Sequence, residues 1–383
     1  MNMKIAITGG HLTPALAVID ELKRKKEKIE IIYFGRRYTF EGEKILSNDY
    51  QVISKISGIK YIDLETGRLQ RRFSKHTVSS LLKIPHGFLQ AYKILKNEKP
   101  NLIMSFGGYL AVPVVITAFL LKIPAITHEQ TVAVGLSNRI ISIFAKKILV
   151  SFEKSLKYFP KKKVVLTGNP IRKEIFNLEK KTLKSLPKSL QKIIQEKLDD
   201  SNKKLIYITG GNQGSQTINK LIWELLPELL KSYSVIHQCG YKDWEAIKSG
   251  KIIFKPNEHY YIAPWIDTKE IGWLLNIADL VVSRSGANTI YELGVLGKPS
   301  VLIPIPWVVN SEQQKNAEIL SDAGLARILS ENNLKSWRLK TVIKEMFDNI
   351  ERYRNIGTEF RTQLKVDAAS AIIFEIDSII KPA

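Results

Sequence analysis

The sequence contains a single cysteine, Cys239, so no disulfide can form within the chain. This favours a reducing compartment, because disulfides persist in oxidising ones. Long apolar runs are also missing: the most apolar stretch, residues 109–121, is interrupted by Pro113 and is too short to span a bilayer. No charged-then-apolar leader precedes Ile5. We therefore expect a protein of the cytoplasm or of the cytoplasmic side of a membrane.

Several catalytic motifs are absent as well. Neither G-x-G-x-x-G nor the P-loop pattern occurs, which removes the usual support for dinucleotide-dependent hydride transfer and for ATP hydrolysis. The chain has no G-x-S-x-G elbow and no His, Cys, Asp and Glu grouping with metal-ligand spacing. Any active site must be built from loops of another kind.

Acidic residues are outnumbered, 37 against 58 basic ones, which gives a formal net charge of +21. One explanation is the abundance of Lys, Ile and Asn throughout, as an AT-rich genome produces. The other is attraction to a polyanion, either nucleic acid or an anionic membrane leaflet. The basic residues are spread out and no nucleic-acid module is recognised, so we expect no nucleic-acid partner.

Short apolar runs alternate with helix-period stretches in two successive halves. In the first half we expect strands at 4–7, 29–34, 101–106, 124–128 and 147–151, with helices at 14–25 and 110–121. In the second half we expect strands at 203–209, 234–238, 277–283 and 299–304, with helices at 217–230, 288–295 and 311–323. This alternation predicts two α/β domains of Rossmann type, with parallel sheets and a cleft between them.

A lysine run at residues 161–163 is followed by a further expected strand and then by a turn-type break at Gly168-Asn169-Pro170, which marks the expected boundary. We divide the chain into an N-terminal domain, residues 1–165, and a C-terminal domain, residues 166–350. The remaining residues, 351–383, are expected to form terminal helices, and whether they pack back on the first domain is left open.

Three glycine-bearing loops, residues 8–11, 210–215 and 283–289, stand where a strand passes into a helix. Glycine lets a backbone approach a ligand closely, and the following helix N-terminus suits a diphosphate. Each loop alone is equally well explained as a tight turn, but three at corresponding strand ends together indicate a ligand site. Glu292, one turn into the third helix, suits ribose hydroxyls, although a solvated glutamate is the plain alternative. His11 suits a general base near neutral pH, or it only caps the next helix.

The sequence resembles the MurG family of peptidoglycan N-acetylglucosaminyltransferases along nearly the whole chain. The matching segments follow one another in the same order as in that family. The most specific are His128-Glu129-Gln130 after Ile-Pro, and Gly168-Asn169-Pro170 followed by Arg172. The other matching segments are 8–15, 106–109, 135–138, 210–219, 284–292 and 313–317. The resemblance implies the GT-B fold, an α/β fold in which two Rossmann-like domains have parallel sheets facing a central cleft.

The resemblance further implies an inverting transferase. It would move GlcNAc from UDP-GlcNAc to the 4-hydroxyl of MurNAc in undecaprenyl-pyrophosphoryl-MurNAc-peptide, the step from lipid I to lipid II. The implied partners are UDP-GlcNAc, a polyprenyl-pyrophosphate-linked muramyl peptide and an anionic membrane surface at the cytoplasmic face of the bacterial membrane. The reaction implied by the resemblance requires no cofactor, and stimulation by a divalent cation is left open.

The resemblance also assigns residues. His11 would be catalytic and remove the proton of the acceptor hydroxyl. The helix starting near Ala287 would take the diphosphate, Glu292 the ribose, Ile266 the uracil region and Gln313 the sugar hydroxyls. The implied donor set is Thr8, Gly9, Gly10, Thr131, Arg172, Asn212, Ile266, Ala287, Asn288, Thr289, Glu292 and Gln313. The implied acceptor side is His11, Tyr109, Glu129 and Asn138.

Three positions depart from the family pattern. Ala6-Ile7 precede Thr8 where the family has two more glycines, which puts the acceptor diphosphate contact in question. Thr131 replaces an asparagine, and Asn212 replaces a serine. These departures keep open a homologue that has lost turnover. Other open alternatives are a GT-B transferase for another lipid acceptor, a UDP-sugar epimerase and a basic nucleic-acid-binding protein.

Residues 68–99 mix basic and apolar side chains, which suits an anionic membrane interface. The alternative is that the apolar residues face the sheet and the charges form a solvated helix face. The basic residues are Arg68, Arg71, Arg72, Lys75, Lys83, Lys93 and Lys96, and the apolar ones are Phe73, Leu81, Leu82, Ile84, Phe88 and Leu89.

Overall fold

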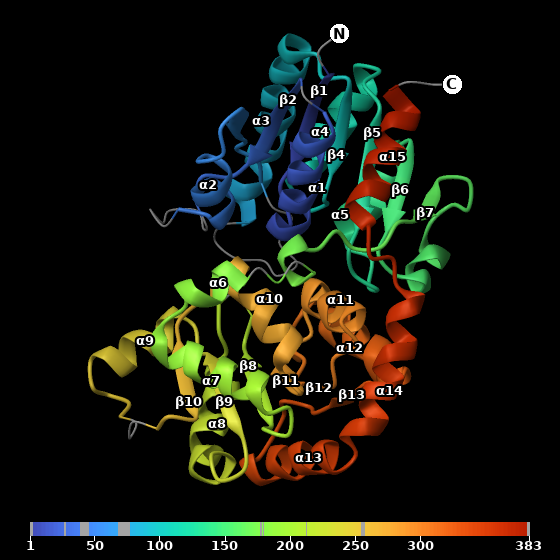
Figure 1. Ribbon diagram of the computed structural model, residues 1–383. Helices are drawn as coiled ribbons and strands as arrows, with labels where there is room; N and C mark the ends of the chain where they lie inside the picture. The colour runs from blue at the N-terminus through green and yellow to red at the C-terminus, as the bar shows by residue number, and fades with distance from the viewer. Residues whose placement is uncertain are drawn as a thin grey trace. The chain divides into compact units, whose positions relative to one another are not determined.

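The computed structural model describes residues 3–26, 28–38, 46–67, 77–176, 178, 180–211, 213–253 and 257–380 (Figure 1). The chain forms two compact units. Unit 1 comprises Met1–Ile171 and Val366–Ala383, and unit 2 comprises Arg172–Lys365. The terminal segment that we treated as one piece, 351–383, is therefore shared: α14 lies in unit 2 and α15 in unit 1.

Unit 1 contains a seven-stranded sheet in the order β3-β2-β1-β4-β5-β6-β7, with every neighbouring pair parallel. Because the strands are parallel, all their carboxyl ends meet at one edge of the sheet. The strands are β1 (Met3–Thr8), β2 (Ile29–Gly35), β3 (Ile59–Asp63), β4 (Leu102–Ser105), β5 (Ala125–Glu129), β6 (Lys147–Val150) and β7 (Val164–Leu166). The helices are α1 (Leu12–Lys25), α2 (Asn48–Ile53), α3 (Thr77–Glu98), α4 (Ala111–Leu120), α5 (Leu136–Phe144), the 3₁₀ helix η1 (Glu153–Tyr158) and α15 (Ala368–Ile380).

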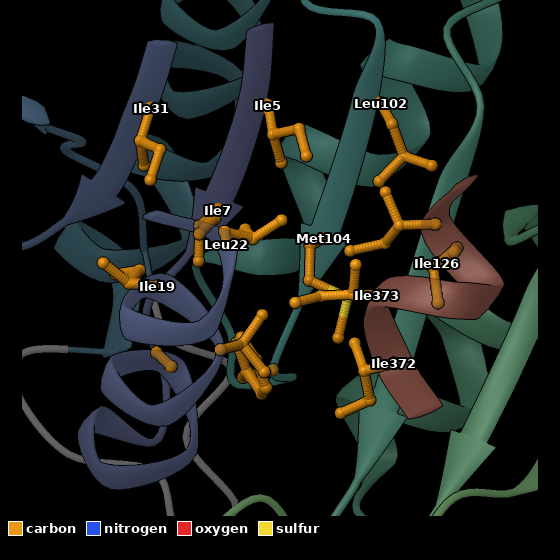
Figure 2. Close-up of a cluster of buried hydrophobic side chains, with 14 of the residues drawn as sticks. Ile5, Ile7, Ile19, Leu22, Ile31, Leu102, Met104, Ile126, Ile372 and Ile373 are labelled. Atoms are coloured by element: carbon orange, nitrogen blue, oxygen red, sulfur yellow. The ribbon is translucent and has the colours of Figure 1, made fainter. Parts of the chain in front are cut away.

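Helices cover both faces of this sheet. Alternate residues of a strand point to opposite faces, so Ile5 and Ile7 join one core cluster and Ala6 joins the other. The first cluster is closed by α1 and α15, and the second by α3, α4 and α5. Figure 2 shows Ile372 and Ile373 of α15 beside Met104 and Ile126 of the sheet. A helix that follows unit 2 in the sequence thus completes the core of unit 1.

Unit 2 contains a six-stranded parallel sheet in the order β10-β9-β8-β11-β12-β13. The strands are β8 (Leu205–Thr209), β9 (Ser234–Gln238), β10 (Tyr260–Ala263), β11 (Leu280–Ser283), β12 (Ser300–Leu302) and β13 (Ala326–Ile328). The α-helices are α6 (Lys180–Ser185), α7 (Lys188–Asp199), α8 (Gln216–Leu229), α9 (Tyr241–Lys248), α10 (Thr268–Ile277), α11 (Ala287–Val295), α12 (Glu312–Asp322), α13 (Ser336–Asp348) and α14 (Ile350–Phe360). The 3₁₀ helices are η2 (Lys173–Ile175), η3 (Val309–Ser311) and η4 (Arg361–Gln363).

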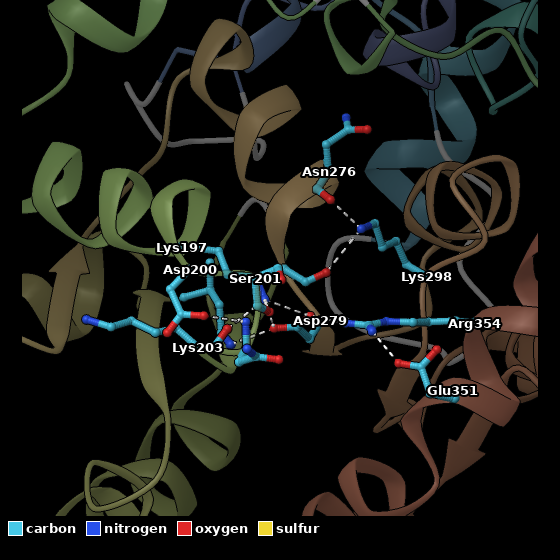
Figure 3. Close-up of polar contacts among 12 residues, drawn as sticks. Lys197, Asp200, Ser201, Lys203, Asn276, Asp279, Lys298, Glu351 and Arg354 are labelled. Carbon is cyan, nitrogen blue, oxygen red and sulfur yellow. Dashed lines mark hydrogen bonds and ion pairs between the residues drawn. The ribbon is translucent and has the colours of Figure 1, made fainter.

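A polar network joins the amino ends of the strands in unit 2 (Figure 3). Asp279 accepts a hydrogen bond from the backbone N–H of Leu205 at 2.8 Å and pairs with Lys197 at 2.9 Å and Arg354 at 2.6 Å. The amine of Lys298 donates to the Ala278 carbonyl at 3.1 Å, and burial lowers its pKa to about 8. The network fixes α7 and α14 to the edge of the sheet opposite the helix-starting loops.

The expected elements are confirmed to within a few residues, and so is the class of two parallel α/β sheets. The sequence analysis missed the strands β3, β10 and β13. β3 is an edge strand of the sheet in unit 1, and β10 and β13 are the two edge strands of the sheet in unit 2. These strands have mixed burial rather than a continuous apolar run, so they lack the pattern of a fully buried strand.

The role of α15 predicts a selective effect on unit 1. Ile372 is fully buried, so Ile372→Ala should destabilise unit 1 by about 2–5 kcal/mol, the usual cost of such a cavity. Phe374, on the same helix, is 70% exposed, so Phe374→Ala serves as the control. Calorimetry should show a lowered melting transition for unit 1 only in the first variant. Equal melting of the two variants would contradict the packing described.

Candidate active site

Two glycine loops of unit 1 lie in close contact at the carboxyl edge of its sheet. Thr8, the last residue of β1, is buried, and Gly9 and Gly10 follow it. A Cβ on Gly10 would lie 2.6 Å from the carbonyl oxygen of Gly107, so no larger residue fits there. Gly107 itself has φ +77°, a conformation that glycine adopts readily. The two loops therefore meet backbone to backbone at this point, with Gly10 exposed and Gly9 and Gly107 buried.

His11 is the N-cap residue of α1; the residue is exposed to solvent, yet partial burial of its ring lowers the pKa of His11 to about 4, so the imidazole is neutral at physiological pH. It makes no capping hydrogen bond in the described part of the chain, so helix capping does not explain the histidine. Ala6 and Ile7, which replace two family glycines, are fully buried within β1.

Glu129 holds the loop that follows β5. Its Oε1 accepts a hydrogen bond from the Thr131 N–H at 3.1 Å and lies 3.0 Å from the Thr131 hydroxyl. Its Oε2 accepts from the Gly135 N–H at 3.2 Å and from Nδ2 of Asn138 at 2.9 Å. Burial raises the pKa of Glu129, while these hydrogen bonds act in the opposite direction.

Three residues that the resemblance places at the substrates take part in these contacts within unit 1. Thr131, Glu129 and Asn138 are all buried, and Glu129 is hydrogen-bonded to each of the other two, whereas Tyr109 is half-buried. A carboxylate with this many internal donors is suited to shaping the loop. The geometry therefore favours Glu129 as a residue that positions its neighbours.

His128 lies on β5 with its ring fully buried. Nε2 is 2.9 Å from the Gly168 carbonyl, so this nitrogen carries the proton. Burial lowers the pKa of His128 to about 4, which keeps the ring neutral at physiological pH. Among the described residues, Nδ1 of His128 and both amide atoms of Gln130 have no hydrogen-bond partner. Such buried orphans are uncommon in folded proteins.

In unit 2, two expected donor residues form an ion pair. Nε of Arg172 donates to Oε1 of Glu292 at 2.7 Å, and both side chains are mostly buried. Burial lowers the pKa of Arg172, but the adjacent carboxylate raises it above its ordinary value overall, so the guanidinium stays charged. The pair holds Glu292 in one orientation on α11.

Arg284, which the sequence analysis gave no role of its own, connects three loops. It donates to Oγ of Ser215 at 2.8 Å, to the Ile303 carbonyl at 2.9 Å and to Glu331 at 2.8 Å. The arginine is buried within the third glycine loop, and a basic residue between a strand and a glycine was the only signal available in the sequence. It holds the loops after β8, β12 and β13 at fixed positions around its own loop after β11.

Most of the other unit 2 residues predicted for the donor lie in the first turn of α11 or are hydrogen-bonded to the loop before it. Ala287, Asn288 and Thr289 form its first turn, where backbone N–H groups have no partner within the helix. Gln313 accepts through Oε1 from the Ile305 N–H at 3.1 Å, and its carbonyl accepts from Oγ of Ser285 at 2.8 Å. Ile266 is buried and its N–H donates to Gln238 at 3.2 Å. Asn212 lies outside the described residues.

The part of the chain that the structure describes contains no group of three or more His, Cys, Asp and Glu side chains arranged to hold a metal. In the same residues, no helix has both the length and the apolar character needed to cross a bilayer.

The N-terminal domain of glycosyltransferase family 28 matches residues 8–150, and the C-terminal domain of that family matches residues 205–372. A UDP-N-acetylglucosamine–N-acetylmuramyl-(pentapeptide) pyrophosphoryl-undecaprenol N-acetylglucosamine transferase from Clostridium tetani is 34% identical over 92% of both chains. The enzyme of the same name from Clostridium perfringens is 36% identical, also over 92% of both chains. The crystal structure of MurG from Acinetobacter baumannii has a TM-score of 0.69 at 22% identity, covering 98% of this chain and 99% of that one.

The contacts of Glu129 predict how its loss should act. Glu129→Gln removes the charge and leaves at least one donor of the loop unpaired, which should cost unit 1 about 1–3 kcal/mol. Activity and the melting temperature of unit 1 should fall together. Glu153→Gln, at an exposed position of η1, is the control and should change neither. A large loss of activity with unchanged melting would instead indicate direct contact of Glu129 with a substrate.

Proposed function

The chain belongs to the MurG family of N-acetylglucosaminyltransferases, within glycosyltransferase family 28, and from this premise we infer its reaction. We propose that it transfers N-acetylglucosamine from UDP-N-acetylglucosamine to the 4-hydroxyl of the muramyl sugar of a pyrophosphoryl-polyprenol-linked muramyl peptide, a step in peptidoglycan synthesis. The observation that carries the proposal is the relationship to the clostridial enzymes, which extends over 92% of both chains.

The donor occupies the carboxyl edge of unit 2. The first turn of α11 accepts the diphosphate, because its N–H groups and the helix dipole favour a negative charge there. Glu292, held by Arg172 at 2.7 Å, keeps its second oxygen for the ribose hydroxyls. Ile266 lies against the uracil, and Gln313 contacts the sugar hydroxyls.

The acceptor is bound by the glycine loops of unit 1, with Tyr109 beside them. His11, exposed at the start of α1, removes the proton from the attacking hydroxyl. That oxygen forms a bond to the anomeric carbon while the bond from this carbon to the UDP oxygen breaks, so the configuration inverts and the product is β-linked. The first turn of α11 stabilises the negative charge that develops on UDP.

A membrane surface brings the enzyme to its lipid-linked acceptor at the cytoplasmic face. The helix layer formed by α3, α4 and α5 carries exposed apolar side chains on its outer side. They are Leu82, Leu89, Phe119, Leu120 and Ile143, between 55% and 74% exposed. Lys83, Ile84 and Phe88 of α3 are partly buried, whereas Lys93 and Lys96 are exposed. The other basic and apolar residues predicted here, from 68 to 76 and Leu81, lie outside the described residues or side chains.

Transfer itself tests the proposal. Wild type incubated with labelled UDP-N-acetylglucosamine and a lipid-linked muramyl peptide should give a disaccharide with a β-linkage to the 4-hydroxyl. His11→Ala should lower turnover about 10²- to 10⁴-fold, the usual contribution of a general base, with donor binding unchanged. His259→Ala, in unit 2, is the matched control. Transfer only to a lipid without the muramyl sugar, or no transfer at all, would refute the proposed acceptor or the proposed activity respectively.

The membrane surface is tested by co-sedimentation with vesicles of phosphatidylglycerol. The double variant Leu82→Ser and Leu89→Ser should weaken vesicle binding about tenfold or more. The variant lacks the two leucine side chains whose transfer from water into the bilayer interface favours binding. Phe374→Ser changes an equally exposed residue on α15, which covers the opposite face of the sheet, and should bind like wild type. Equal weakening by both substitutions would argue against a surface confined to the α3, α4 and α5 layer.

A further inference from the structure

Trp307 is a large aromatic residue that the fold leaves in solvent. It is 74% exposed and lies between β12 and α12, six residues before Gln313. Tryptophan is usually well buried, because its ring removes a large apolar area from water. An exposed indole beside a ligand site is therefore a candidate contact for that ligand.

The segment that carries Trp307 is anchored at both ends to the third glycine loop. At its start, the Ile303 N–H donates to the Ser283 carbonyl at 2.9 Å, and Arg284 donates to the Ile303 carbonyl at 2.9 Å. At its end, the Gln313 carbonyl accepts from Oγ of Ser285 at 2.8 Å. Both ends of the segment that carries Trp307 are therefore fixed against the loop that opens α11.

The backbone around Trp307 is restrained as well as anchored. Pro304 and Pro306 fix their own φ angles just before it. Asn310 and Ser311 follow with φ of 56° and 51°, a left-handed conformation that costs free energy in residues other than glycine. A rigid segment holds its aromatic residue in place before a ligand arrives, which lowers the entropic cost of binding.

The strand order of unit 2 indicates which part of the donor lies there. Along the carboxyl edge the strands follow in the order β10, β9, β8, β11, β12 and β13. Ile266 follows β10, Glu292 stands on the helix after β11, and Gln313 on the helix after β12. A nucleotide sugar with its uracil at Ile266 and its diphosphate at α11 must place its sugar on the β12 side. Trp307 comes directly after β12.

We propose that the indole of Trp307 packs against the apolar face of the donor's N-acetylglucosamine ring and thereby contributes to recognition of the sugar. A pyranose ring presents several C–H groups on one face, which match the π-surface of an indole. Gln313 contacts the polar rim of the same ring. This inference rests on the proposed function, since it requires a UDP-sugar in unit 2.

The test compares UDP-N-acetylglucosamine with UDP in wild type and Trp307→Ala. The substitution should weaken UDP-N-acetylglucosamine binding about fivefold to tenfold, the range of one aromatic contact, and leave UDP binding within about twofold. Trp307→Phe, which keeps a smaller aromatic ring, should restore most of the sugar-dependent part. Trp337→Ala, at another exposed tryptophan on α13, is the control and should change neither ligand.

Intrinsic fluorescence gives a second readout. The wild-type signal should change with UDP-N-acetylglucosamine more than with UDP, and Trp307→Phe should remove that difference while Trp337→Phe keeps it. Equal weakening of both ligands in Trp307→Ala would overturn the proposal, because the loop would then act on the nucleotide. A change only in vesicle binding would also overturn it, in favour of a membrane contact. Failure of wild type to bind either ligand would refute the proposed function itself.

Discussion

Parallel strand direction is the constraint on which both units depend. Because every neighbouring pair in the two sheets is parallel, each strand delivers its following loop to the same edge. The glycine loop at Gly9 and Gly10, the loop after β5 that Glu129 holds and the loop before α11 all follow strands in this way. At that edge the helices begin, and their first N–H groups need partners from outside the helix. Unit 2 adds Arg284, whose buried charge ties three of these loops together.

The strands at the centre of each sheet were predictable from the sequence, because residues buried on both faces produce continuous apolar runs. Ile5 to Thr8 and Leu205 to Thr209 are examples. The edge strand β3 was not predictable in this way, because Lys60 and Asp63 interrupt its apolar pattern and make the segment resemble a polar loop. The division of the C-terminal helices between two units also escaped prediction, because a helix's sequence shows that it has an apolar face but not which sheet will cover it.

The resemblance predicts which residues form the site, but their contacts with one another could not be predicted from the sequence. Glu129 was expected at the acceptor, yet its carboxylate accepts hydrogen bonds from Thr131, Gly135 and Asn138 inside unit 1. Arg172 and Glu292 are 120 residues apart, and no local pattern could show that they pair. Pairing of this kind depends on how loops from distant strands meet, which is a property of the folded sheet.

The position of α15 has a consequence for synthesis on the ribosome. The last strand of unit 1 ends at Leu166, and its closing helix begins only at Ala368, after all of unit 2 has been made. Until then Met104 and Ile126 lack the isoleucines that cover them. The nascent chain therefore carries an open apolar surface for as long as unit 2 takes to emerge, and such surfaces are where chaperones bind and aggregation begins. The order of elements along the gene, rather than their final packing, determines the length of that exposure.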